Sequence, residues 1–122
     1  MNTRTKIVLQ EDLDTFLSGA PAILVIGTFD PLLAAHAERL TELSRLNSGK
    51  VVVAVTDPTN TVLSLAARQE MVAALDIVDF VLRHGRGIES AHAWAAIHDD
   101  TALHNQWSDS FKEHVRRRSQ PA

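Results

Sequence analysis

Residues 27–36, Gly-Thr-Phe-Asp-Pro-Leu-Leu-Ala-Ala-His, combine residue types that can bind a phosphate group. Gly27 ends the apolar run 22–26 and permits a tight turn. Asp30 is a favourable N-cap residue, and proline is tolerated in the first turn that follows. A strand, a glycine turn and a helix N-terminus favour an anion, because the first-turn amides point outward along the helix dipole. We therefore expect a phosphate site here, although many parallel-sheet proteins have the same turn and bind nothing.

Three further residues could contribute to such a site. Arg68 lies between Leu65 and Val72 on the stripe expected to face the sheet, so its charge needs a partner or a place at the rim. Ser108 and Ser110 are predicted to open the last helix, where hydroxyls and free amides could bind a phosphate. Each residue also has an ordinary alternative, which is a rim arginine for Arg68 and an N-cap for the serines.

A metal centre is not expected. The chain has no cysteine, which excludes disulfides and thiolate ligands. Its six histidines show no spacing typical of a zinc site.

The elements that must position these residues alternate between strand and helix. Apolar runs predict buried strands over 22–26, 51–55 and 77–82. Helical spacing predicts helices within 6–17 and over 31–46, 64–75, 88–98 and 108–118, with an irregular segment or short edge strand over 99–106. This order predicts one domain over 1–122, a Rossmann-like α/β/α sandwich with a parallel sheet. A ligand would bind at the carboxyl ends of its strands.

Composition narrows the classes of function. The formal net charge of −3 supplies no basic field for nucleic acid. No apolar run approaches the roughly 20 residues that span a bilayer, so no membrane partner is expected. The charged start of the chain is not followed by a long apolar segment, which is unlike a signal peptide. We therefore expect a cytoplasmic protein.

The 27–36 segment resembles the signature of the nucleotidyltransferase (cytidylyltransferase-like) superfamily, which reads Gly-x-Phe-Asp, two residues, then His-x-Gly-His. Gly27, Phe29, Asp30 and His36 match in register. Leu33 stands in place of the first histidine, and Ala35 in place of the glycine.

Three other segments extend the resemblance. Residues 67–75 and 78–81 are similar to the second helix and third strand of the nucleotidyltransferase domain in ADP-heptose synthase and glycerol-3-phosphate cytidylyltransferase-like proteins. The segment 107–110, Trp-Ser-Asp-Ser, resembles the serine and threonine turn that opens the last helix of that family.

This resemblance implies a reaction in which CTP or ATP, with Mg²⁺, is joined to a phosphorylated sugar or alcohol and pyrophosphate is released. His36 would be the catalytic residue that stabilises phosphate charge, and the alternative is a histidine that only packs or faces solvent. A homodimer is also implied. The implied nucleotide-binding residues are Gly27, Thr28, Phe29, Asp30, Arg68, Ser108 and Ser110.

The departures from the family pattern lie where the chemistry would occur. Leu33 removes one histidine, and losing one such electrostatic group typically slows a reaction by about 10²–10³-fold. The loop 56–61, where the family carries basic residues, has neither lysine nor arginine, and Asp57 would repel phosphates unless Mg²⁺ lay between them. We therefore favour a weakly active or catalytically degenerate domain with a nucleotide-binding or scaffold role. The alternative is an active cytidylyl- or adenylyltransferase.

Overall fold

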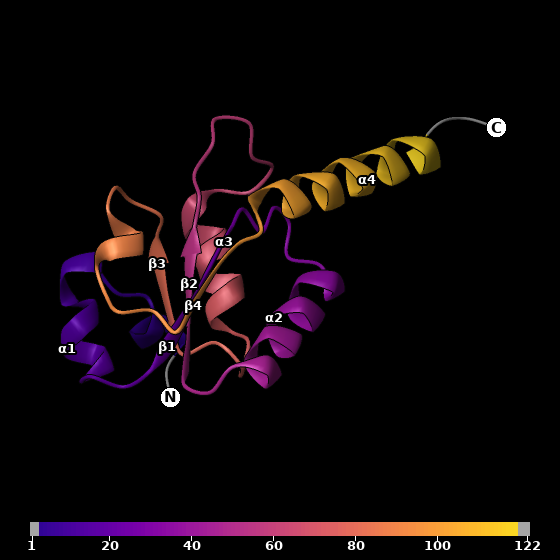
Figure 1. Cartoon of the computed structure of the whole chain (residues 1–122). Helices are drawn as coiled ribbons and strands as arrows, with labels where there is room; N and C mark the ends of the chain where they lie inside the picture. The colour runs from indigo at the N-terminus through magenta and orange to yellow at the C-terminus, as the bar shows by residue number, and fades with distance from the viewer. Residues whose placement is uncertain (1–2, 120–122) are drawn as a thin grey trace.

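Four parallel strands form the centre of the molecule (Figure 1). The computed structural model describes residues 3–119. The strands are β1 (Ala22–Gly27), β2 (Lys50–Val55), β3 (Phe80–Arg83) and β4 (Ala96–Asp99), in the sheet order β3-β2-β1-β4. The chain passes from β1 through β2 to β3 and then returns to the other side of β1, so the topological switch point lies between β1 and β4. The predicted Rossmann-like α/β fold is confirmed.

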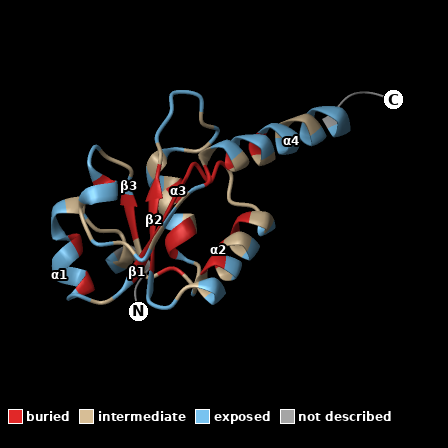
Figure 2. Cartoon of the chain, viewed as in Figure 1, coloured by how far each residue is buried: buried red, intermediate tan, exposed pale blue. Residues whose placement is uncertain are grey.

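Helices cover both faces of the sheet, which explains the continuous apolar runs. The helices α2 (Ala34–Leu46) and α3 (Leu65–Ala73) pack on one face through side chains such as Leu40 and Val72. The short α1 (Leu13–Leu17) and the 3-10 turn η3 (Ile88–Ser90) cover the other face. Two further 3-10 turns precede α1, η1 (Thr3–Lys6) and η2 (Gln10–Asp12). All of β1 is buried, as expected for a parallel strand between two layers (Figure 2).

The last helix, α4 (Thr101–Ser119), begins directly after β4 and extends beyond the body of the molecule (Figure 1). Its first turns pack at the carboxyl edge of the sheet, and its outer turns are largely exposed (Figure 2). Within residues 3–119, no helix is both long and apolar enough to cross a membrane.

Three predictions for the second half of the chain were wrong. The helix predicted over 88–98 is η3 followed by β4, because Ala96–Asp99 pairs with Ile23–Ile26 of β1. Alanine favours helices intrinsically, but pairing with a buried strand overrides that preference. The segment 99–106, predicted as irregular or as an edge strand, contains the end of β4 and the start of α4. The last helix therefore begins at Thr101 and not near Ser108.

Candidate functional site

The last residue of β1 and the turn after it carry four of the predicted nucleotide-binding residues, and the side chains of the turn point mainly into the protein. Thr28, Phe29 and Asp30 are all buried. Phe29 adopts a left-handed backbone conformation with φ of 51°, and its ring joins the core under α2. The Thr28 hydroxyl lies 3.0 Å from the hydroxyl of Thr56, which links the ends of β1 and β2.

Asp30 has a different role from the predicted N-cap. Its carboxylate accepts the backbone N–H groups of Val62, at 2.7 Å, and Leu63, at 2.9 Å. It therefore holds the loop before α3 against the turn after β1. The N-cap of α2 is Leu33, and the helix begins three residues later than Pro31. The prediction that Asp30 caps this helix was wrong because the carboxylate binds two amides from another loop.

His36, the predicted catalytic residue, is fully buried. Its Nδ1 accepts the Leu33 N–H at 2.9 Å, so the neutral ring carries its proton on Nε2. Burial lowers the pKa of His36 to about 4. Among the described residues, Nε2 has no hydrogen-bond partner. The rings of Phe29, His104 and Trp107 surround the imidazole, with centroids 4.4–5.3 Å away.

A second buried histidine, His104 of α4, was missed by the sequence analysis. Its Nδ1 accepts the Thr28 N–H at 3.1 Å. Burial, and next the neighbouring His36, lower the pKa of His104 to about 4. The ring lies against Gly27, where an added Cβ atom would collide with the imidazole. Glycine is therefore required at this position for close approach of α4. The sequence would have indicated His104 if the last helix had been predicted to start at Thr101, because His104 and Trp107 then lie on one face. The helix was predicted to start near Ser108 instead.

An ion pair closes the outer side of this histidine pair. The Arg39 Nε donates to the Asp100 carboxylate at 3.1 Å, and Asp100 is almost completely buried. This pair connects α2 to the start of α4.

Arg68 is also fully buried, and its charge is used within the protein. Its guanidinium donates to the backbone carbonyls of Thr28, Thr56 and Leu63 at 2.6–3.1 Å. A fourth hydrogen bond, at 3.0 Å, reaches the Asp57 carboxylate. The expectation that this charge needs a partner is confirmed. Arg68 joins the carboxyl ends of β1 and β2, and Asp57 neutralises it.

A polar cleft of about 350 Å³ lies beside this cluster, between the loop after β2 and α4. Its wall includes the hydroxyl of Ser108, which donates to the Asp30 carbonyl at 2.6 Å. Ser108 lies within α4 and not at its start, so the predicted first-turn role of Ser108 and Ser110 was wrong. Ser110 is exposed and lies outside this cleft. The residues that line the cleft are Thr28, Asp30, Pro58, Asn60, Thr61, Asn105, Ser108, Asp109 and Lys112.

Two of the carboxylates close to the cleft, Asp30 and Asp57, do not fit the role of magnesium ligands, whereas Asp109 also lines the cleft. Asp30 uses both carboxylate oxygens for backbone amides, and Asp57 is bound to Arg68. Between residues 3 and 119, no group of three or more histidine, aspartate or glutamate side chains is arranged to hold a metal ion. A magnesium ion here would have to be held mainly by nucleotide phosphates, which is a common arrangement for this ion.

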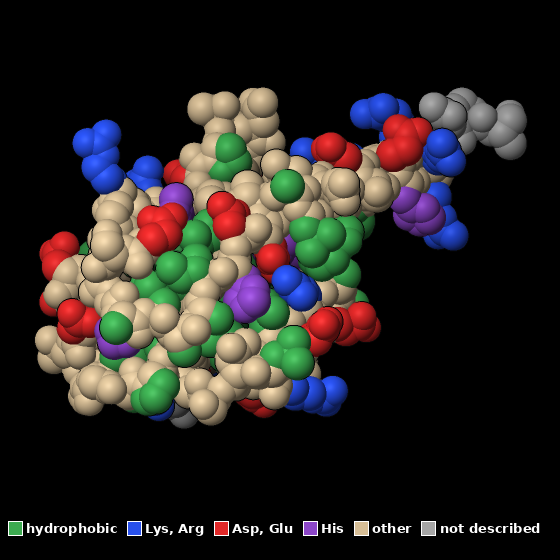
Figure 3. Space-filling model, viewed as in Figure 1, with side chains coloured by type: hydrophobic (Ala, Val, Ile, Leu, Met, Phe, Trp, Pro, Cys, Tyr) green, Lys and Arg blue, Asp and Glu red, His purple; other side chains and the backbone are tan. Residues whose placement is uncertain are grey.

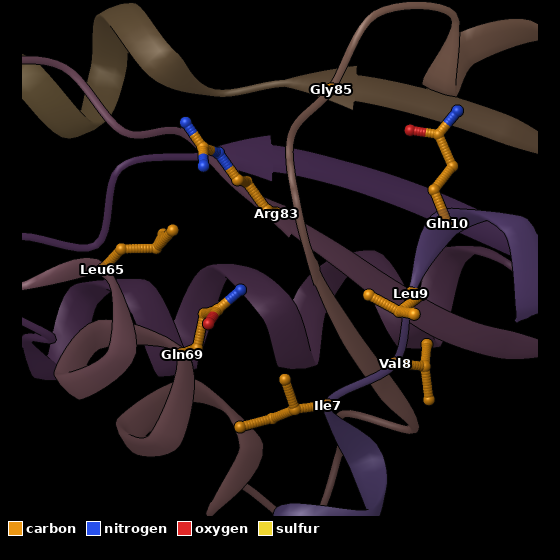
Figure 4. Close-up of a pocket in the computed structure, with 8 residues that line it drawn as sticks. All are labelled: Ile7, Val8, Leu9, Gln10, Leu65, Gln69, Arg83 and Gly85. Atoms are coloured by element: carbon orange, nitrogen blue, oxygen red, sulfur yellow. The ribbon is translucent and has the colours of Figure 1, made fainter.

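A second hollow, of about 400 Å³, lies at the β3 edge of the sheet (Figure 4). The segment before α1 forms one wall, where the Val8 N–H donates to the Val81 carbonyl at 2.9 Å. Leu65 and Gln69 of α3 form another, and Arg83 closes the end (Figure 4). This hollow contains none of the predicted site residues.

Comparison with known proteins supports the fold. No protein-family model matches the chain, and no curated protein matches it. One similar solved structure is described as the lipopolysaccharide core biosynthesis protein from Thermoplasma volcanium GSS1. The similarity covers 57% of this chain and 62% of that chain, with a TM-score of 0.50 and 23% identity. The chain thus spans less than two thirds of that structure. At this identity the similarity shows a shared fold.

Proposed function

We propose that this chain is a nucleotidyltransferase-type domain that binds a nucleotide without transferring it. The proposal is supported by the position of the polar cleft at the carboxyl ends of β1 and β2, where open α/β sheets bind ligands. Thr28 and Asp30 of the signature-like turn line this cleft together with Ser108. The resemblance in the signature supports a nucleotide as the ligand.

The observation that argues against catalysis is the state of His36. A histidine that stabilises phosphate charge must present an N–H group to the ligand, whereas the Nε2–H of this neutral imidazole is fully buried among the rings of Phe29, His104 and Trp107. The Arg68 guanidinium is likewise bound to backbone carbonyls and Asp57. Two side chains that could stabilise phosphate charge, His36 and Arg68, therefore do not face the cleft. A third, the first histidine of the signature, is replaced by Leu33.

Lys112 favours the alternative, an active cytidylyl- or adenylyltransferase. Among the described residues that line the cleft, it is the only lysine or arginine, so its ammonium group could bind a phosphate. Mg²⁺ bound with CTP or ATP would then supply the remaining charge.

Two measurements on the full chain separate these proposals. Calorimetric titration with CTP, CMP, ATP and AMP, each with Mg²⁺, should detect binding of at least one nucleotide. Pyrophosphate release from CTP or ATP, with glycerol 3-phosphate or a sugar phosphate as acceptor, should remain at the level of the protein-free blank. Acceptor-dependent release would establish the active transferase. No binding at millimolar concentration by folded protein would contradict nucleotide binding and leave a scaffold role.

Lys112→Met tests whether the cleft is the site. We expect this variant to bind a phosphorylated nucleotide about tenfold more weakly, because one charge-assisted hydrogen bond is lost. Lys50→Met is the matched control, since Lys50 is exposed at the opposite, amino end of β2. Equal affinities in the two variants would place the nucleotide elsewhere.

A further inference from the structure

We infer that the cleft binds a nucleoside or nucleoside monophosphate in preference to a nucleoside triphosphate. This inference rests on the proposed nucleotide binding and specifies its ligand. Its basis is that side chains of the protein itself bind backbone amides at both ends of the signature-like turn.

Two of these amides are satisfied by imidazoles. The Thr28 N–H, at the end of β1, donates to His104 Nδ1. The Leu33 N–H, at the start of α2, donates to His36 Nδ1. These are the positions at which a strand–turn–helix segment would otherwise present amides to phosphate oxygens. A phosphate chain entering the turn would have to displace a buried ring that also packs against Trp107.

The strong cations nearby are also paired within the protein. Arg68 is fully buried and donates to three carbonyls and to Asp57. Arg39 is paired with the buried Asp100. Neither guanidinium is among the residues that line the cleft. A ligand in the cleft therefore meets few of the positive charges that lie close by.

The charges of the cleft itself disfavour a polyanion. Asp30 and Asp109 contribute two carboxylates, against one ammonium group from Lys112. Each additional phosphate adds repulsion from the carboxylates, whereas the single ammonium can pair with only one phosphate well. The other polar side chains of the wall are neutral amides and hydroxyls, from Thr28, Asn60, Thr61, Asn105 and Ser108. Such groups are suited to ribose hydroxyls and to the polar edge of a base.

The test compares cytidine, CMP and CTP, and the corresponding adenosine series, by calorimetric titration of the full chain with and without Mg²⁺. For the base that is bound, we expect the nucleoside and the monophosphate to bind at least tenfold more tightly than the triphosphate in both conditions. This comparison uses the unaltered protein, so it does not depend on a variant that folds.

Asn105→Ala and Gln106→Ala then locate the ligand. Both residues are exposed on α4, but only Asn105 lines the cleft. We expect Asn105→Ala to weaken nucleoside binding about tenfold and Gln106→Ala to leave it unchanged.

The outcomes distinguish this inference from the proposed function. Tightest binding of the triphosphate would overturn the inference and leave nucleotide binding intact. The same would follow if the two α4 variants bound the nucleoside equally well, because the ligand would then lie outside the cleft. No binding of any member of either series would overturn both proposals.

Discussion

At the scale of single residues, several polar side chains that sequence patterns assign to ligand binding stabilise the fold. Arg68 shows why the two roles are easily confused. A buried arginine on a sheet-facing stripe must be paired, and its partner can be a ligand or the protein itself. The sequence predicted the need for a partner, but the carbonyls of Thr28, Thr56 and Leu63 come together only in the folded chain.

Arg68→Met should therefore reduce the free energy of unfolding strongly, by about 3–5 kcal/mol, because Asp57 loses its closest partner and three carbonyls lose their donor. Urea unfolding measures this change. Arg45→Met, at an exposed position near the end of α2, is the control and should change stability by less than about 0.5 kcal/mol. Similar urea midpoints for the two variants would show that the hydrogen bonds from Arg68 to the strand ends do not stabilise the fold.

At the scale of elements, the apolar runs identified strands best where both faces of the strand are buried. The positions of β1 and β2 were predicted correctly because a continuous run of branched residues indicates a strand covered on two sides. In contrast, β4 has the sequence Ala-Ile-His-Asp and only partial burial, so its pairing with β1 is not encoded in a local pattern. Missing β4 moved the predicted start of α4 by seven residues, which hid His104 from the candidate site.

The true start of α4 is stabilised by Asp99, whose carboxylate accepts both the amide and the hydroxyl of Thr101, at 3.1 and 2.6 Å. These hydrogen bonds lower the pKa of Asp99, so their contribution is present at neutral pH and is lost as the pH falls through that lowered pKa. Asp99→Ala should cost about 1 kcal/mol at pH 7.

Backbone chemical shifts of residues 101–104 should then move towards values for a frayed helix, with faster amide exchange in that turn. Asp76→Ala, in the loop before β3, serves as the control for removal of an exposed carboxylate. Unchanged chemical shifts over 101–104 would mean that the helix start depends on packing and not on the hydrogen bonds between Asp99 and Thr101.

At the scale of the whole molecule, the sheet order positions all the features of the candidate site. After β3 the chain returns to the other side of β1, where it adds β4. The start of α4 therefore meets the end of β1 at the topological switch point. There His104 fills the space beside Gly27 and packs against His36, and the open cleft lies towards the loop after β2. The exposed outer turns of α4 carry three consecutive arginines, at the end where basic side chains gather in Figure 3. The homodimer implied by the family resemblance stays a prediction.

Burial of two neutral histidines at this point should make global stability depend on pH. Each has a pKa of about 4 in the folded protein, against about 6.5 in the unfolded chain. Between these values the unfolded chain binds more protons, so the free energy of unfolding must fall as the pH is lowered from about 6.5 to 4. A shift of this size corresponds to about 3 kcal/mol for each histidine, with the full contribution present above pH 6.5.

Urea unfolding at several pH values between 7 and 4 tests this argument, and two variants assign the effect. His36→Gln removes one buried imidazole, so its loss of stability with falling pH should be shallower than that of the unaltered protein. His114→Gln removes a histidine that is exposed on α4. The stability of this variant should fall with decreasing pH as steeply as that of the unaltered protein. If the free energy of unfolding of both variants changed with pH as steeply as that of the unaltered protein, the pKa of His36 would be normal in the folded state. Its imidazole would then be accessible to a ligand, and the main argument against catalysis would no longer hold.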